Sequence, residues 1–256
     1  LEVSFLDRIN LDGLVFLDSH CDTILKVDLV SLKLDINPFQ INKEGIFIKN
    51  IEMVGAEIND HKYPTNLKSS IGMFVEDLSV GPNKKSSEES IRWALQNIDF
   101  IKTAYHYIDH QFDNSTDITI EKLSINASGF PSENLLNSIK VIDANSPSII
   151  ITQNNRVPDS LSSKNNIPAL ALEDLCISNG HFVYKGPSNE KPFFAVNFKD
   201  LDLKDIELSL SKIHYKNQKF EGIINQFSAN EKSGFRLNFL KADYASLNDN
   251  EIKLDA

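Results

Sequence analysis

The sequence lacks the features by which most enzymes and membrane-spanning proteins are identified. It contains only two cysteines, Cys21 and Cys176, among 256 residues. Two cysteines cannot build a disulfide framework, and the sequence leaves open whether they are free or bridged. No run of 18 or more apolar residues occurs, so no segment has the composition of a transmembrane helix. A Gly-rich phosphate loop, a G-x-S-x-G elbow and a CxxC pair are also missing. We therefore expect a protein that is not an enzyme and that uses no cofactor and no metal.

Acidic residues outnumber basic ones, 36 to 26, and this excess limits the possible partners. The formal net charge is −10 and the isoelectric point is about 5.1. Such an acidic balance disfavours binding to nucleic acid and docking on an anionic membrane surface. The hydrophobic fraction of 41% is below the usual globular value. A sheet with one solvated face needs fewer apolar residues than a doubly covered one.

One spacing of apolar residues recurs along the chain, at positions 0, +2, +5 and +7 with a polar pair in the middle. Looser copies start at Ile9, Val27, Ile46, Trp93, Leu170 and Phe235. The clean copies are Ile118, Ile120, Leu123 and Ile125; Val196, Phe198, Leu201 and Leu203; and Leu201, Leu203, Ile206 and Leu208.

This spacing is that of a β-strand with one interruption. Alternation places every second side chain on one face, and a step of three would move the later residues to the opposite face. A β-bulge inserts one residue and returns them to the first face. We therefore predict bulges at Glu121-Lys122, Lys199-Asp200 and Lys204-Asp205. A chain that repeats this device is expected to be all-β, with a long, curved, mostly antiparallel sheet that forms an open apolar trough from stacked repeats.

A longer repeat overlies the first and indicates a duplicated supersecondary unit. Apolar residues at 0, +2, +7 and +9 occur as Ile98, Phe100, Tyr105 and Tyr107; as Leu175, Ile177, Phe182 and Tyr184; and as Ile206, Leu208, Ile213 and Tyr215. We expect groove repeats over 1–152, with an irregular insertion near 60–90. A polar linker is expected over 153–167, and the repeats continue over 168–256. Both ends of the sequence have strand-like patterns, so we expect a fragment of a longer protein.

Two local clusters could carry chemistry, but each has a simpler interpretation. Asp18-Ser19-His20-Cys21-Asp22 could form a metal or nucleophile site, although Asp and Ser also favour a turn between strands. His106 and His110 would lie on one face of a helix, but on a strand they are about 13 Å apart, too far to share an ion. His20, His61, His181 and His214 are interpreted as single surface or strand residues. The aromatic residues Phe182, Tyr184, Phe193, Phe194 and Phe198 fit either a ligand box or ordinary core packing.

The repeats resemble the AsmA-like family, and most closely the TamB-type translocation-and-assembly proteins of Gram-negative bacteria. The resemblance is a pattern of spacings rather than a catalytic signature, and it covers most of the chain outside roughly 60–90 and 153–167. It is carried by Leu14–Asp28, Ile48–Ala56, Tyr105–Asp109, Leu172–Tyr184 and Asn230–Leu237. It implies a periplasmic segment of an inner-membrane-anchored envelope protein, with an outer-membrane β-barrel partner that other parts of the protein would contact.

The resemblance and the apolar face together predict a function. We expect the trough to shield phospholipid acyl chains from water during transfer between the inner and outer membranes. One alternative is an assembly module whose sheet edges pair with strands of outer-membrane proteins, and another is a purely structural β-repeat. The predicted groove lining is Val27, Leu29, Leu32, Leu34, Ile118, Ile120, Leu123, Ile125, Val196, Phe198, Leu201, Leu203, Ile206 and Leu208.

Overall fold

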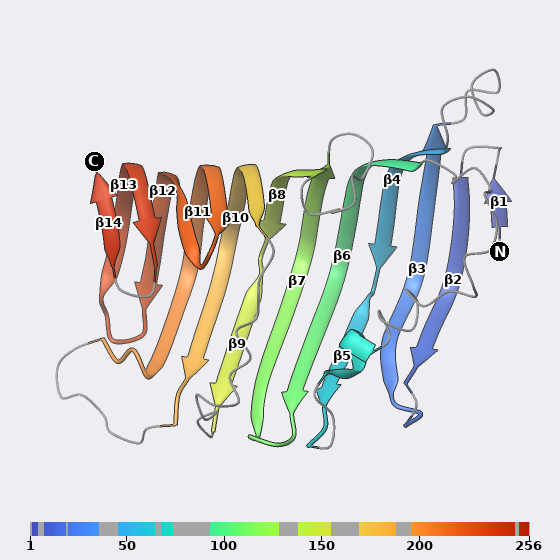
Figure 1. Cartoon of the computed structure of the whole chain (residues 1–256), viewed down its shortest axis with the longest axis horizontal. Helices are drawn as coiled ribbons and strands as arrows, with labels where there is room; N and C mark the ends of the chain where they lie inside the picture. The colour runs from blue at the N-terminus through green and yellow to red at the C-terminus, as the bar shows by residue number, and fades with distance from the viewer. Residues whose placement is uncertain are drawn as a thin grey trace.

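The computed structural model of the chain describes ten segments of the sequence and is all-β, as the spacing predicts. The described residues are 2–4, 8–18, 20–35, 46–64, 68–73, 93–127, 138–154, 169–187, 196–248 and 251–255. Their strands join into a single 14-stranded sheet (Figure 1). The only α-helix within these residues is a single turn over 70–73, and no described helix is long and apolar enough to span a membrane.

Most strands are long, and neighbours in sequence are usually neighbours in the sheet. The order is β1-β2-β3-β4-β6-β7-β8-β10-β11-β12-β13-β14, with β5 between β3 and β6 and β9 between β7 and β10. The strands are β1 (Glu2–Ser4), β2 (Arg8–Leu17), β3 (Thr23–Asp35), β4 (Ile46–Val54), β5 (Glu57–Lys62), β6 (Trp93–Asp109), β7 (Asn114–Ala127), β8 (Ile139–Asn145), β9 (Ser148–Gln153), β10 (Leu170–Lys185), β11 (Asp200–Lys216), β12 (Lys219–Glu231), β13 (Arg236–Leu247) and β14 (Ile252–Asp255).

Two of the strands are broken into collinear halves, and these mark the places where the sheet becomes parallel. The broken strand β4–β5 is antiparallel to β3 and parallel to β6. The broken strand β8–β9 is antiparallel to β7 and parallel to β10. The other described ladders are antiparallel. We call the first arrangement, β3 to β6, the first junction, and the second, β7 to β10, the second junction.

Each junction contains two residues with a positive φ angle that lie side by side on neighbouring strands. In the first, Gly55 (φ 63°) lies beside Lys102 (φ 53°), because the Gly55 N–H donates to Ile101 O at 2.9 Å. In the second, Ser146 (φ 50°) lies beside Asn179 (φ 54°), because the Ser146 N–H donates to Ser178 O at 2.8 Å. Neighbouring strands therefore carry their irregular residues at the same level of the sheet.

The bulge predicted at Glu121-Lys122 is not formed, although the β6–β7 ladder is interrupted there. Ile101 pairs with Lys122 and Thr103 with Ile120, so Lys102 and Glu121 form no ladder pair. The register on either side is unchanged, since both strands carry one irregular residue. The predicted bulge at Lys204-Asp205 is confirmed as a register shift between Lys204 and Glu207, with φ 51° at Asp205.

The bulge predicted at Lys199-Asp200 is wrong, because β11 begins only at Asp200. The preceding residues form a turn in which Asn197 Oδ1 accepts from the Lys199 N–H at 3.0 Å and Asn197 O accepts from the Asp200 N–H at 3.0 Å. Asparagine favours such a turn because its side chain can replace a backbone acceptor. The apolar residues before the turn therefore do not continue the strand.

The buried core is small and lies inside the bends. One cluster is centred on Val27, Val30 and Ala56, and Leu11 and Leu14 of β2 pack against it. The other is centred on Leu172, Leu210 and Ile213. In each cluster, residues three apart on one strand lie on the same face, such as Val27 with Val30 and Leu210 with Ile213. A step of three thus keeps both halves of a strand on one apolar face at Val27–Val30 and at Leu210–Ile213, whereas the predicted steps are Leu29–Leu32 and Leu203–Ile206.

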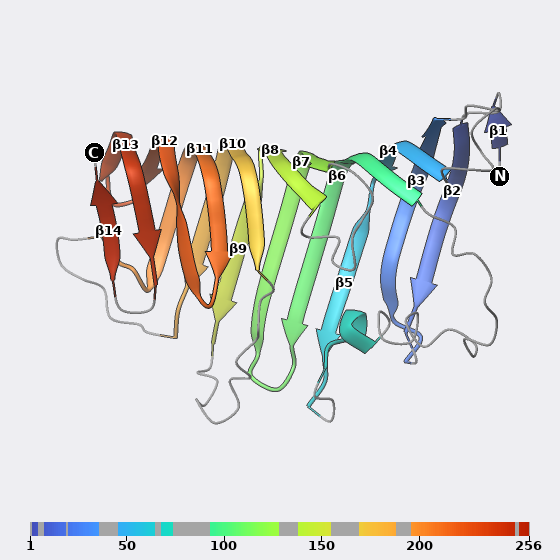
Figure 2. The same cartoon turned by 45° about the horizontal axis from the view of Figure 1, so that its top comes forward.

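The sheet is continuous across the predicted linker region. Its strands bend near their upper ends, and the bent ends of β4, β6 and β8 come forward in the tilted view (Figure 2). Most of the predicted linker, 153–167, and much of the predicted irregular insertion, 60–90, lie outside the described residues. The described part of 60–90 contains the end of β5 and the helical turn. Cys21 and Cys176 are both free.

Candidate functional site

The candidate site is the apolar face of the sheet, and the predicted lining residues of β3 and β7 belong to it to different degrees. Val27 is fully buried, with 2% of its surface exposed, and Leu32 packs against the same cluster. Leu29 and Leu34 are half-buried and lie outside that cluster. On β3 the apolar face is carried by Leu25, Val27, Val30 and Leu32, so the spacing is right but its start is two residues earlier.

On β7 the burial follows the predicted spacing. Thr119, Glu121 and Lys122 between the lining residues are exposed, whereas Ser124 is half-buried. The lining residues themselves, Ile118, Ile120, Leu123 and Ile125, are half-buried. Half-burial of four apolar residues along one strand indicates a face that is sheltered but still reaches solvent.

The C-terminal group of predicted lining residues is divided by the turn before β11. Leu201, Leu203, Ile206 and Leu208 lie on β11 and are half-buried, and Leu208 packs against the second core cluster. Val196 and Phe198 precede the strand, and Phe198 is 77% exposed. These two residues are therefore not part of the face that β11 presents. The proposed aromatic box is not assembled as a unit either, because Phe198 projects into solvent and Phe193 and Phe194 lie outside the described residues.

The apolar face is large because the sheet forms a single extended layer. A two-layer fold would cover most large apolar side chains of the inner face. Among the described residues, the buried apolar side chains are few, and all of them are valine, leucine, isoleucine or alanine. The face thus offers extended apolar contact rather than one deep site.

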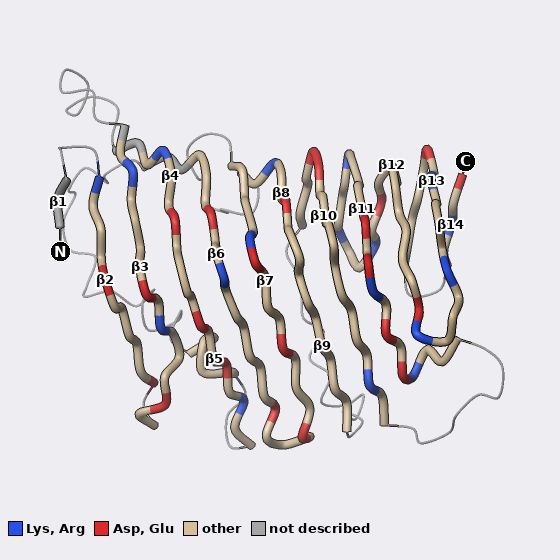
Figure 3. The backbone as a smooth tube through the Cα atoms, turned by 180° about the vertical axis from the view of Figure 1, so that it is seen from behind, with Lys and Arg blue, Asp and Glu red and all other residues tan. Residues whose placement is uncertain are grey.

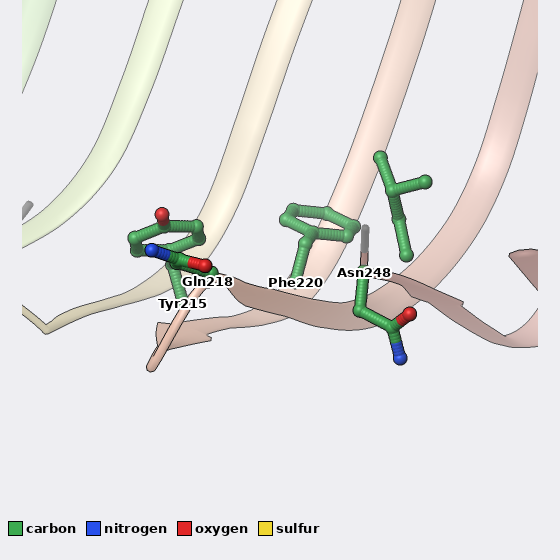
Figure 4. Close-up of a pocket in the computed structure, with 5 residues that line it drawn as sticks. Tyr215, Gln218, Phe220 and Asn248 are labelled. Atoms are coloured by element: carbon green, nitrogen blue, oxygen red, sulfur yellow. The ribbon is translucent and has the colours of Figure 1, made fainter. Parts of the chain in front are cut away.

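A separate pocket of about 380 Å³ lies where β11 turns into β12. Tyr215, Phe220 and Leu247 supply its apolar wall, and Gln218 and Asn248 supply amide groups (Figure 4). Phe220 also packs against the second core cluster, so the pocket is continuous with the apolar face. Its size falls within the range of small-molecule sites, which are about 300–1,000 Å³.

At the lower end of the first junction, the apolar face gives way to a buried polar group. Asp60 is buried and accepts hydrogen bonds from Tyr105 Oη at 3.2 Å, Ser70 Oγ at 3.3 Å and the Ile71 N–H at 3.0 Å. Burial, followed by the charge of Asp60, raises the pKa of Tyr105 well above its ordinary value. Burial, followed by the charges of Asp109 and Asp60, raises the pKa of Tyr107 to about 12. Both phenols therefore stay neutral at physiological pH.

The structure confirms a turn between β2 and β3, in which Asp18 and residues 20–22 are described. The Asp18 N–H donates to Asp22 O at 2.9 Å, and Asp18 Oδ1 accepts from the His20 and Asp22 N–H groups at 2.8 and 2.9 Å. His106 and His110 do not act together, because His106 contacts Asp117 at 2.8 Å. His110 instead lies beside His61, at 3.2 Å between ring nitrogens. His20 is an exposed residue and His61 is a strand residue, as predicted, but His61 does not stand singly because it contacts His110.

One constellation that sequence reasoning missed has the residue types of a hydrolase triad. His181 of β10 contacts Asp202 of β11 through Nε2 at 2.9 Å and Ser148 of β9 through Nδ1 at 3.4 Å. A working triad also needs free N–H groups aimed at the developing oxyanion. Ser148 pairs with both Thr119 and His181 in the ladders, so this described part of the sheet supplies no such donors beside it. These three residues form a polar cross-strand contact.

The comparisons with known proteins add no relative to this description. No family model matches the chain, and no curated protein matches it. The functional argument therefore depends on the geometry of the apolar face.

Proposed function

We propose that the apolar face of this sheet shields the acyl chains of phospholipids from water while they move along it. The observation that carries the proposal is a row of half-buried aliphatic side chains on one face of one continuous sheet. On β7 these are Ile118, Ile120, Leu123 and Ile125, and on β11 they are Leu201, Leu203, Ile206 and Leu208.

The energetic argument depends on the length of an acyl chain. Each CH₂ group exposed to water costs about 0.8 kcal/mol, so a complete chain in water is strongly disfavoured. A continuous apolar face removes most of this cost without a tight binding site. Because the same side-chain types recur from strand to strand, a lipid would meet similar contacts at successive positions, which favours movement over retention.

The decisive test places a charge on the face. Leu123→Asp puts a carboxylate among half-buried residues, where it can still reach solvent, so we expect the protein to remain folded. The charge should, however, raise a barrier for every acyl chain that passes. Thr119→Asp is the matched control, since Thr119 is exposed on the same strand. The readouts are thermal melting, mass spectrometry of phospholipids that co-purify under native conditions, and transfer of a labelled phospholipid between vesicles.

The outcomes separate the conduit from other functions. Loss of bound lipid and of transfer in folded Leu123→Asp, with both retained in Thr119→Asp, supports the proposal. Normal lipid content and transfer in folded Leu123→Asp would refute it. Unfolding of Leu123→Asp would instead show that Leu123 belongs to a packed core of a structural repeat.

A second candidate function is supported by the edge of the sheet. The edge strand β14 pairs only with Tyr244–Leu247 of β13, so Arg236–Asp243 has no described strand on its outer side. An exposed edge of this kind can accept an extended strand of a client protein. Proline in place of Asn238 should weaken such pairing and leave lipid transfer unchanged. Unchanged strand pairing together with weaker lipid transfer would favour the lipid conduit alone.

A further inference from the structure

Three of the six histidines of the chain meet at the lower edge of the sheet. His61 is on β5, His110 follows β6, and His20 lies in the turn between β2 and β3. Tyr63 connects them, because its ring lies 5.2 Å from the ring of His110 and 4.6 Å from the ring of His20 between centroids. We call His20, His61, Tyr63 and His110 the ring cluster. Its members come from segments that are far apart in sequence, and the first junction brings them together.

Within the ring cluster, two imidazole nitrogens face each other. His61 Nδ1 and His110 Nε2 are 3.2 Å apart, and the two rings are nearly parallel, at 18°. The backbone fixes this approach, because the His110 N–H donates to Lys62 O at 3.0 Å. A tetrahedral ion bound to two imidazoles at about 2.0–2.1 Å holds their nitrogens about 3.4 Å apart. In the structure the two nitrogens are hydrogen-bonded, so one ring N–H donates to the other ring nitrogen. An ion would replace that shared proton, with the separation opening to about 3.4 Å and each ring rotating about its soft χ2 torsion so that both lone pairs converge on the ion.

The charges around the ring cluster favour a cation. Figure 3 shows acidic residues along the lower ends of β2, β3, β5, β6 and β7. Lys62 is already paired with Asp109, at 3.3 Å. Asp18 has only 5% of its side chain exposed, and its Oδ2 atom has no hydrogen-bond partner, although His20 Nδ1 lies 3.7 Å away. This buried carboxylate oxygen adds a negative potential that the nearby side chains leave uncompensated.

From this geometry we propose that His61 and His110 bind one divalent transition-metal ion, of the class of zinc or copper. Imidazole nitrogen suits these ions, whereas magnesium and calcium prefer oxygen. Among the described residues, no group of three or more His, Cys, Asp or Glu side chains is arranged around one ion position. The ion would therefore take two nitrogens from the protein and complete its coordination with water. Its effect would be to fasten the end of β5 to the turn that follows β6.

The test is titration of the purified chain with zinc chloride and, separately, with copper sulfate at neutral pH. We expect one ion per chain by calorimetry and a rise in melting temperature when the ion is present, because an ion that binds only the folded state stabilises it. His61→Ala and His110→Ala should each abolish both effects. His214→Ala is the control, since His214 is an exposed residue of β11 outside the ring cluster. Acidic buffer should also abolish binding, because the ligating imidazoles must be neutral.

The metal-binding proposal is independent of the lipid function, and the results that would overturn it leave the lipid proposal untouched. It is overturned if neither ion binds stoichiometrically, or if binding survives both single substitutions. It is also overturned if binding is lost in Cys21→Ser but not in His61→Ala, since the ion would then belong to the β2–β3 turn. Circular dichroism of the variants shows whether they are folded, and the exposure of His110 makes loss of the fold an unexpected result.

Discussion

The two junctions share the same strand pairing and the same positive-φ positions. At their lower ends, however, the first carries a buried polar side chain and the second an apolar one. Lys102 and Asn179, the positive-φ residues of β6 and β10, are 77 residues apart. The same offset relates Tyr105 and Tyr107 to Phe182 and Tyr184. At the first junction Tyr107 pairs with the buried Asp60, whereas at the second Tyr184 pairs with the half-buried Ile151. A duplicated scaffold thus carries a polar anchor in one copy and a continuation of the apolar face in the other.

The broken strands of the two junctions differ in a second way. At the first, a Cβ atom on Gly55 would overlap the carboxylate of Asp28, so glycine is favoured by space as well as by its φ angle. At the second, Ser146 tolerates a positive φ angle. Its hydroxyl donates to Asn145 Oδ1 at 2.9 Å and accepts from Asn179 Nδ2 at 3.0 Å. The same bend is therefore achieved by a missing side chain in one copy and by side-chain hydrogen bonds in the other.

The largest effect is expected from removing the polar anchor of the first junction. Asp60→Ala leaves three donors without their acceptor at a buried position, and it should lower the free energy of unfolding by about 3 kcal/mol. The loss is measured by urea denaturation. Ile151→Ala is the matched change at the second junction, where only a half-buried side chain is shortened. An equal loss for Asp60→Ala and Ile151→Ala would contradict the difference in polarity.

Alkaline titration of Tyr107 tests the polar surroundings of the first junction by a second method. The raised pKa of Tyr107, about 12 against an ordinary value of 10.0, means that folding favours the neutral phenol. This contribution is complete below pH 10 and is lost as the pH rises toward 12. Phenolate absorbance should show Tyr107 titrating late, and Tyr107→Phe should remove that component. A phenol in Tyr107 that ionises near pH 10 would show that the carboxylates do not act on it.

Next in size is the backbone effect at the first break. Gly55→Ala introduces a side chain at a positive φ angle and forces Asp28 to move, so we expect a loss of about 2 kcal/mol in urea denaturation. The double variant with Asp28→Ala should recover the part that is due to the overlap. If the double variant is no more stable than Gly55→Ala alone, the approach of Asp28 is not what favours glycine there.

A smaller effect, and a stabilising one, is expected on β6, where Lys102 lies beside Gly55. Lys102 is exposed and has φ 53°, so Lys102→Gly should stabilise the protein by about 1 kcal/mol through relief of backbone strain. Asn179→Gly relieves similar strain but removes the Asn179–Ser146 hydrogen bond, so its effect should be near zero. Thermal melting of both variants measures the difference. Stabilisation of similar size by both would show that the side-chain contact at the second junction contributes nothing.

The sequence predicts the strands and the apolar spacing better than it predicts their contacts. Period-two alternation with a step of three is a local property, and it identifies the face on β7 and the bulge at Asp205. The same spacing also fits a turn flanked by apolar residues, so it wrongly places Val196 and Phe198 in a strand that begins only at Asp200. The longer repeat is explained by the structure, because its step of five spans the positive-φ residues Lys102 and Asn179.

The ring cluster could not be predicted in the same way. His61 and His110 are separated by 49 residues, and they meet only because β5 and β6 are parallel. Strand order is a non-local property that no single spacing encodes. The same applies to Asp60, whose burial depends on the turn at 70–73 and on Tyr105 of the next strand.

The parallel pairings also determine the order in which this sheet can assemble. Hairpins such as β6–β7 join Asp109 to Asn114 across a short turn, and such units form within about 1–10 μs. Ile46 and Trp93 must instead find each other across a loop of 46 intervening residues, which costs more closure entropy before any contact is gained. The protein should therefore fold as hairpin modules that later dock at the two junctions. In hydrogen exchange, the amides of the β6–β7 hairpin should be protected before those that bridge β4 and β6.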